Sequence, residues 1–303
     1  MASRVIENVA VAGATGNVGA HVLQALLEQR KFNITVLART KKDFPAGVAV
    51  KVVDFSSVDA LTKALTGQHA VVDATFTTDD TPQRLIDASV AAGVHRYIPS
   101  DFGCDPALPG VHELPVFARK QAAWEHVKAA AASSELTWTI VACGVFLDWN
   151  LSTTYMNIDL KGKKIALFGD GTNVIPWTTL SNVGRATAAA LLAPEETQNR
   201  VVYVHDILKS QKEVADLAKQ ALGPEGWEET TVDITKQFND AMADFKSGKH
   251  SPMVFGTMIQ YASSTPVLMR KWPRDDNSLL GLSGMSDTEV KILIKELAGL
   301  ENS

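Results

Sequence analysis

Short apolar runs alternate with helical patterns along the first half of the chain. The runs are rich in Val and Ile and apolar on both faces, as strands buried in a parallel sheet are. We predict strands over Asn8–Ala12, Asn33–Arg39, Val48–Asp54, His69–Thr75, Arg96–Pro99 and Trp138–Gly144. Strands that alternate with helices predict repeated βαβ units, and therefore an α/β fold with a doubly wound parallel sheet.

Helical periodicity fills the intervals between these runs. One helix face is predicted from apolar residues at helical spacing, namely Val18, Val22, Leu23, Leu26 and Leu27. Thr81 is predicted to cap the N-terminus of another helix, with Pro82 at its first position and Gly93 at its end. A longer helix is predicted from about Leu114 to Ser133.

The pattern is looser after residue 150. We predict two further strands and a helix there, over Lys164–Phe168, Val201–His205 and Ser210–Leu222. Ser286 and Glu289 have the spacing of a capping box, which predicts the start of a last amphipathic helix. Residues 1–150 are predicted to form one domain, whose sheet is completed by segments from 151–206. Residues 151–303 are predicted to form mainly a smaller second lobe.

Composition and charge exclude several classes of protein. The chain has 303 residues, of which 46% are hydrophobic, so it can bury a large core without disulfides. Its formal net charge is −5 and its Lys and Arg are spread along the chain, which argues against a nucleic-acid surface. Two cysteines, Cys104 and Cys143, cannot form a disulfide framework. No pattern of Cys and His has zinc-ligand spacing, so we expect no metal.

Targeting signals are also missing from the pattern. No 18-residue apolar stretch occurs, and residues 1–12 lack the basic start and apolar run of a signal peptide. We therefore expect a cytoplasmic protein without a membrane partner.

The loop after the first predicted strand has the sequence Gly13-Ala14-Thr15-Gly16-Asn17-Val18-Gly19 and opens a helix. Gly13 permits a tight turn, Gly16 lets the backbone approach a pyrophosphate, and Gly19 lets helix and strand pack closely. The helix N-terminus adds free N–H groups and partial positive charge. The loop therefore predicts a Rossmann-type dinucleotide site, with a plain strand-to-helix joint as the alternative.

The end of the second predicted strand is where such a site tests the 2′ position of the adenosine ribose. NAD sites place Asp or Glu there, whereas NADP sites place a cation. The chain has Arg39-Thr40-Lys41-Lys42 and no carboxylate before Asp43. Arginine can bind a phosphate bidentately, so the sequence predicts NADP(H), with Arg39, Thr40 and Lys42 at the site. The alternative is a solvated basic turn.

Two more strand ends fall at the same edge of the sheet. Asp54 and Phe55 end the third predicted strand, and Thr75 and Phe76 end the fourth. Ligands of open α/β sheets bind at the carboxyl ends of the strands, so we expect these four residues to line the cofactor path.

Several motifs together resemble one known family. They are the glycine loop, Leu37-Ala38-Arg39, Val53-Asp54-Phe55, Arg96-Tyr97-Ile98-Pro99-Ser100-Asp101-Phe102-Gly103 and Val116-Phe117-Ala118-Arg119-Lys120. With these motifs the chain resembles the NmrA-like, isoflavone reductase-like atypical short-chain dehydrogenases, and in particular their fungal branch. The resemblance extends over about residues 5–206, includes Phe168-Gly169-Asp170-Gly171, and is weak beyond.

The resemblance implies a sheet of about seven strands, NADPH as hydride donor and a C-terminal lobe that binds the substrate. It implies cofactor contacts at Thr15, Asn17, Val18, Arg39, Phe55, Phe76, Lys120 and Phe146. Phe146 lies in Cys143-Gly144-Val145-Phe146, which is expected near the nicotinamide. One departure is Val116, where a classical short-chain dehydrogenase has Tyr four residues before its Lys; epimerase chemistry that needs this Tyr is not expected.

Lys120 is the predicted catalytic residue. At its ordinary pKa only about one lysine in 2,500 is neutral at pH 7, so we expect a cation that stabilises or protonates a substrate oxygen. A general base would need a lowered pKa, for example from Arg119 nearby. The alternative is an exposed helix lysine.

Other polar groups near Lys120 are predicted to play smaller parts. His112 is counted among the substrate-binding residues, at the mouth of the site where it could relay a proton, although a solvent-exposed loop histidine is the favoured interpretation. Asp101 and Asp105 are expected to cap or pair locally, and Cys143 to pack in a strand.

Apolar residues of the second lobe are predicted to form the substrate wall. They are Phe146, Trp149, Met156 and Trp177, with core packing as the alternative. The sequence thus predicts an NADPH-dependent reductase of an aromatic, phenolic or enone small molecule in secondary metabolism, which could form a homodimer. The competing hypothesis is a non-enzymatic NADP-sensing NmrA-like regulator that binds a partner protein.

Overall fold

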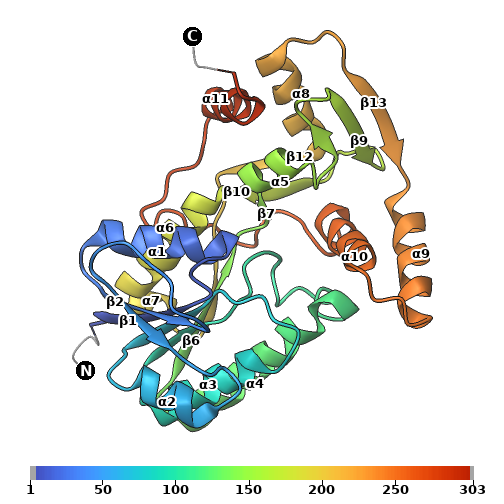
Figure 1. Cartoon of the computed structure of the whole chain (residues 1–303). Coiled ribbons are helices and arrows are strands. Elements are labelled where there is room, and N and C mark those ends of the chain that lie inside the picture. Colours follow the sequence, from blue (N-terminus) through green and yellow to red (C-terminus); the bar gives the residue numbers. More distant parts are fainter. Residues whose placement is uncertain (1–4, 301–303) are drawn as a thin grey trace.

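Seven parallel strands form the central sheet of the first lobe, as the computed structural model of residues 5–300 shows (Figure 1). They are β1 (Asn8–Ala12), β2 (Asn33–Ala38), β3 (Val48–Val52), β4 (Ala70–Asp73), β5 (Arg96–Ile98), β6 (Thr137–Ala142) and β11 (Arg200–Tyr203). Their order across the sheet is β11-β6-β5-β4-β1-β2-β3. All neighbours in this sheet are parallel.

Helices cover both faces of this sheet, which confirms the doubly wound fold class (Figure 1). On one face lie α1 (Asn17–Gln29) and α6 (Leu180–Leu192), and on the other α2 (Val58–Leu65), α3 (Thr81–Ala91) and α4 (Ala118–Ser133). A short helix, α7 (Pro194–Thr197), leads into β11. The sheet is therefore buried on both sides, and its two ends are left for binding.

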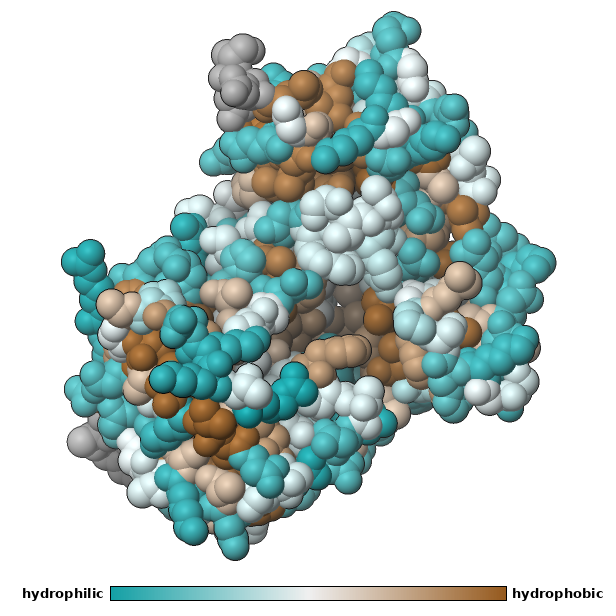
Figure 2. Space-filling model, in the orientation of Figure 1, coloured by the Kyte–Doolittle hydropathy of each residue, from teal (hydrophilic) through white to brown (hydrophobic). Residues whose placement is uncertain are grey.

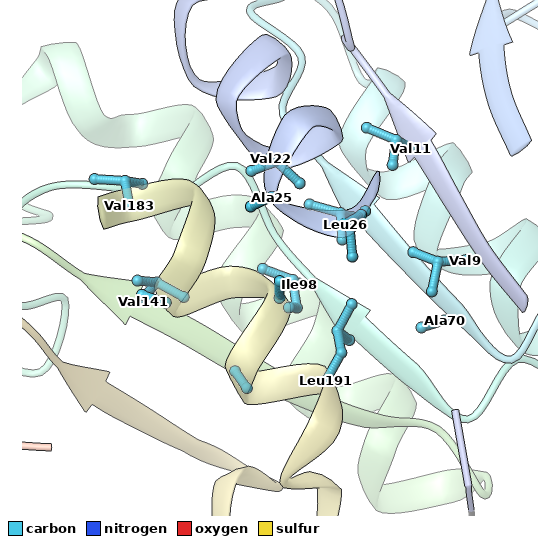
Figure 3. Packing of buried hydrophobic residues seen from close by; sticks show 14 of the residues in the cluster. Val9, Val11, Val22, Ala25, Leu26, Ala70, Ile98, Val141, Val183 and Leu191 are labelled. Atoms are coloured by element: carbon cyan, nitrogen blue, oxygen red, sulfur yellow. The ribbon is translucent and has the colours of Figure 1, made fainter. Parts of the chain in front are cut away.

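Figure 3 shows how α1 and α6 pack on the sheet. Val22 and Leu26 of α1 and Leu191 of α6 lie against Val9 of β1 and Ile98 of β5, and all five side chains are at most 1% exposed. Burying a side chain of this size contributes about 1.5–3 kcal/mol, so this layer fixes the helix that follows the glycine loop.

The second lobe contains two three-stranded sheets and helices around a core of its own. Its strands are β7 (Val145–Phe146), β8 (Ile158–Asp159), β9 (Lys164–Phe168), β10 (Val174–Thr178), β12 (Ile207–Ser210) and β13 (Glu228–Val232). Its helices are α5 (Leu147–Thr153), α8 (Gln211–Leu222), α9 (Ile234–Lys246), α10 (Pro252–Ser264) and α11 (Asp287–Ala298). The sheets have the orders β12-β10-β7 and β13-β9-β8.

The segment 272–285 covers the outer edge of β11. The Asp276 carboxylate accepts the Tyr203 N–H at 2.9 Å, and the Asp276 N–H donates to the Tyr203 carbonyl at 2.9 Å. The Asn277 side-chain amide accepts the His205 N–H at 3.2 Å and donates to the His205 carbonyl at 2.7 Å. The edge of the sheet is thereby hydrogen-bonded, which blocks pairing with another strand.

Most predicted elements lie where the sequence placed them, with three corrections. The cap of α3 is Asp80, and Thr81 and Pro82 are its first two residues. The helix predicted from Leu114 begins as a 3-10 turn over Pro115–Phe117 before α4. The strands β7, β8, β10, β12 and β13 and the helices α2, α5, α7, α9 and α10 were not predicted, whereas the capping box that opens α11 is confirmed.

Two further observations concern what the chain can span or bind. No helix in residues 5–300 is long and apolar enough to cross a membrane. The same residues hold no cluster of three or more His, Cys, Asp or Glu able to hold a metal ion. The predicted first domain begins at residue 1 and the predicted second lobe ends at residue 303. Their outermost residues, 1–4 and 301–303, lie outside the described residues.

Candidate active site

The glycine loop between β1 and α1 has no room for side chains at two positions. Gly13 has φ +81°, and a Cβ atom there would lie 2.4 Å from the Ala74 carbonyl oxygen. A Cβ atom on Gly19 would lie 2.1 Å from the Gly13 carbonyl oxygen. The Gly16 N–H donates to that same carbonyl at 2.9 Å. The loop is thus a tight turn that only glycine at these positions allows.

The N-terminus of α1 presents free backbone N–H groups. Gly16 is its N-cap, no side chain caps it, and no acidic residue lies in its first turn. Thr15, Gly16 and Asn17 are exposed, while Val18 is half-buried against the sheet. Unbonded N–H groups and the helix dipole attract anions, so this cradle fits the pyrophosphate of a dinucleotide.

Exposed cations follow β2 at the edge of the same site. Arg39, Thr40, Lys41 and Lys42 are all exposed, and none of the three cations forms an ion pair with another described residue. An unpaired guanidinium is available to a phosphate, which it can bind bidentately.

The ends of β3 and β4 hold the other predicted cofactor residues. The Asp54 carboxylate accepts hydrogen bonds from the Ser56 hydroxyl and N–H, and these bonds lower the pKa of Asp54. Phe55 is half-buried beside it. At the end of β4, Thr75 donates twice to Asp73, and Phe76 is 99% exposed. An aromatic side chain without protein packing is a candidate surface for a ligand.

A charged cluster lies at the carboxyl end of β5. The buried Asp101 carboxylate has its Oδ1 atom 3.4 Å from Lys120 Nζ and its Oδ2 atom 3.3 Å from His112 Nε2. The Lys120 side chain is 32% exposed, and its Nζ lies 5.7 Å from the centre of the Phe117 ring. His112 is 8% exposed and packs edge-on against Trp124 at 5.4 Å. Lys120 is therefore the member of the cluster that faces solvent.

Electrostatics keep Asp101 ionised. Burial alone would raise the pKa of Asp101, but the Lys120 ammonium and the contact with His112 outweigh burial and hold that pKa below its ordinary value. The ionised carboxylate in turn stabilises the positive charge on Lys120 by Coulomb attraction. The charge beside Lys120 is thus opposite to the one that a lysine general base needs.

The backbone behind this cluster is fixed by a second glycine. Gly144 has φ +67°, and a Cβ atom there would lie 2.1 Å from the Pro176 carbonyl oxygen. The N–H groups of Cys143 and Gly144 donate to the Gly103 carbonyl at 3.1 and 2.9 Å. Burial raises the pKa of the Cys104 thiol to about 12 and also raises that of Cys143, which disfavours the thiolate at both positions.

The predicted substrate residues lie in different surroundings. Phe146 and Trp149 are half-buried, and the Trp149 ring lies 5.3 Å from that of Tyr155. Met156 is 2% exposed and Trp177 0%, and both pack in the core of the second lobe. Neither offers surface to a ligand, so the core alternative holds for these two.

Two expectations about polar residues change with the structure. His112 is buried, and the description as a solvent-exposed loop histidine is wrong. Asp101 pairs locally, as expected, but its partners are Lys120 and His112. Asp105 pairs elsewhere, accepting the Tyr203 hydroxyl at 3.1 Å. Asp101 lies three residues after the end of β5, in the Pro99-Ser100-Asp101-Phe102-Gly103 motif that carried part of the family resemblance.

A hollow separates the two lobes (Figure 2). It lies between the sheet of the first lobe and the elements of the second, and apolar residues form part of its visible wall. One edge of the parallel sheet thus combines the uncapped N-terminus of α1, exposed cations after β2 that lack ion-pair partners among residues 5–300, and Lys120.

Comparisons with known proteins decide the family. Residues 13–172 match a family model described as NAD(P)H-binding. Oxidoreductase poxI of Penicillium oxalicum is 30% identical over 295 residues, which cover 94% of this chain and 93% of its own. An NmrA-like family domain-containing oxidoreductase of Gibberella moniliformis is 32% identical over 143 residues, 47% of this chain and 46% of its own. The chain belongs to the NmrA-like, isoflavone-reductase-like family of NAD(P)H-binding oxidoreductases.

The same fold occurs in solved structures. An isoflavone reductase superposes with a TM-score of 0.76 at 19% identity, covering 95% of this chain and 99% of its own. The comparisons confirm the predicted family, the fold class and a nicotinamide dinucleotide as the cofactor of this oxidoreductase.

Proposed function

We propose that this NmrA-like oxidoreductase is an NADPH-dependent reductase of an aromatic, phenolic or enone small molecule. The observation that carries the proposal is the Lys120 ammonium, held 3.4 Å from the buried Asp101 carboxylate at the carboxyl edge of the glycine-loop sheet. Ligands of such sheets bind at this edge, so a cation there faces the reacting part of a bound substrate.

Phosphate-binding groups support NADPH over NADH. The α1 N-terminus supplies N–H groups for the pyrophosphate, and Arg39 supplies for the 2′-phosphate a guanidinium that has no ion-pair partner among residues 5–300. Bound NADPH supplies a hydride to the substrate. The residues proposed to hold it are Gly13, Thr15, Gly16, Asn17, Val18, Gly19, Arg39, Thr40, Lys42, Asp54, Phe55, Thr75, Phe76, Lys120, Cys143, Gly144 and Phe146.

Lys120 has the charge needed to stabilise an oxyanion. The Lys120 side chain lies 3.4 Å from the Asp101 carboxylate and is 32% exposed, so its ammonium can donate a hydrogen bond or a proton to a substrate oxygen. Phe146 and Trp149 are the proposed apolar wall for the substrate ring. The isoflavone reductase that shares this fold is named for an aromatic substrate, which supports the same substrate class here.

The proposal is tested by NADPH oxidation against a panel of enones, quinones and phenolics. With a substrate found, Lys120→Ala is expected to lower kcat about 10²- to 10³-fold, the loss typical of removing one transition-state donor. The affinity for NADPH should fall much less.

Arg119→Ala is the matched control, because Arg119 is an adjacent, exposed cation on the same helix. It should leave kcat within about twofold of the wild type, as surface substitutions usually do. An unchanged kcat in Lys120→Ala would remove Lys120 from the reaction. Tight NADPH binding without turnover of any panel compound would favour the regulator hypothesis.

A further inference from the structure

Asp101 is the only residue that touches both Lys120 and His112 among the ion pairs of the described chain. Its carboxylate is buried, with a side chain 6% exposed, so neither oxygen relies on bulk water. A buried carboxylate is costly unless it is paired. Here Oδ1 has the Lys120 ammonium at 3.4 Å, while Oδ2 lies 3.3 Å from His112 Nε2 and has no hydrogen-bond partner among residues 5–300. The cluster is therefore a unit in which the position of each group depends on the others.

His112 connects this unit to the loop that precedes α4. The loop carries apolar residues that pack against α9 and α10, including Leu114 and Phe117. His112 itself is held between Asp101 and Trp124, and Trp124 lies one helical turn after Lys120. The imidazole thus lies against one oxygen of Asp101, and Lys120 lies against the other.

A proton relay through His112 does not fit this geometry. Its Nδ1 atom is buried and has no hydrogen-bond partner among the residues of the described chain. The tautomer with a proton on Nε2 faces Asp101 and leaves Nδ1 without a group to which a proton could pass. Lys120 is 32% exposed and reaches solvent without His112.

We propose that Asp101 is a positioning residue that holds the Lys120 ammonium toward the hollow, and that His112 holds Asp101 in turn. This inference rests on the proposed function of Lys120. Asp101 need not touch the substrate, since it acts through the amine beside it. A lysine has four rotatable bonds, so without the carboxylate its ammonium is distributed over many positions.

A double-mutant cycle tests this assignment. Asp101→Asn keeps the shape and removes the charge, and we expect kcat to fall about 10- to 100-fold with KM changed less than about threefold. In the Lys120→Met background, Asp101→Asn should change kcat less than about threefold, because the group it positions is gone. Asp101→Glu retains the carboxylate. The logarithm of its kcat should therefore lie at least halfway from the Asp101→Asn value back to the wild-type value.

Asp105→Asn is the matched control. Asp105 is a buried carboxylate four residues further on that accepts the Tyr203 hydroxyl and makes no contact with Lys120. It should leave kcat near the wild-type value. Equal losses from Asp101→Asn in both backgrounds, or no loss in the wild-type background, would overturn the proposal. If Asp101→Asn does not fold, the same cycle with Asp101→Glu decides between coupled and independent effects.

The cycle has a second readout that does not need turnover. Lys120 is also a proposed cofactor contact, so we expect Asp101→Asn and Lys120→Met to weaken NADPH binding by similar factors and the double variant to weaken it no further. If the double variant instead weakens NADPH binding by the product of the two single factors, Asp101 and Lys120 act independently, which would contradict coupling between them. If the wild type reduces no compound, the proposed function fails, and this binding cycle still tests Asp101 by itself.

Discussion

Arg39 stands one residue beyond the end of β2, exposed and without an ion-pair partner in the described chain. If it binds the 2′-phosphate, Arg39→Ala should weaken NADPH about 10- to 150-fold, since a charge-assisted hydrogen bond contributes about 1.5–3 kcal/mol. NADH, which lacks that phosphate, should bind both proteins equally. Fluorescence titration with each cofactor measures the two affinities.

Lys31→Ala is the control for Arg39. Lys31 is an exposed cation just before β2, at the opposite edge of the sheet, and its removal changes the net charge equally. It should leave NADPH binding within about twofold of the wild type. Equal binding of NADPH and NADH by the wild type would contradict the assignment of Arg39.

At the scale of single residues, the sequence was sufficient for side chains whose place in the fold follows from the strand or helix beside them. Arg39 follows a strand and Lys120 opens a helix, so their places at the sheet edge follow from the element pattern. The burial of His112 depends on a loop that packs against Trp124, and no local pattern contains that contact. Met156 and Trp177 were placed in the site by proximity in sequence, but the second lobe uses them as core.

The strand–loop–helix element around the glycine loop gives a prediction with two different outcomes. A Cβ atom on Gly19 would meet the Gly13 carbonyl at 2.1 Å, so Gly19→Ala should destabilise the fold by about 2–3 kcal/mol. Gly16 has φ −82°, which any residue adopts, and a Cβ there would lie 3.4 Å from the same oxygen. Gly16→Ala should cost less than about 1 kcal/mol.

The two variants separate folding from cofactor binding. Gly16→Ala should bind NADPH at least about tenfold more weakly, because its methyl group stands where the pyrophosphate approaches the backbone. Urea unfolding and fluorescence titration measure the two effects. A Gly16→Ala protein that binds NADPH like the wild type would show that the phosphates do not lie at this turn.

Elements with regular apolar patterns in the first half of the chain were predictable. Short strands with distant partners were not, and the 13-residue helices α9 and α10 were missed where the pattern is looser. The strand β1 was predicted with its bounds, since five small or apolar residues precede the glycines. The strand β10 pairs with β7 and β12, whose residues lie about thirty positions away on either side. Such pairing depends on tertiary contacts, and β7 has only two residues.

At the scale of the whole molecule, the chain passes between the lobes more than once. After β6 it enters the second lobe, returns through α6 to β11, and leaves again. The segment 272–285 then crosses the edge of β11 before α11. The hollow in Figure 2 is therefore bounded by lobes that are joined repeatedly, which favours a site of fixed shape.

A crystal structure of the ternary complex with NADP⁺ and a substrate from the panel tests the central claim most directly. We predict that the substrate ring contacts Phe146 or Trp149, that its oxygen lies within hydrogen-bond distance of Lys120 Nζ, and that Arg39 binds the 2′-phosphate. A substrate bound away from Lys120, or a hollow too narrow for one aromatic ring, would contradict it.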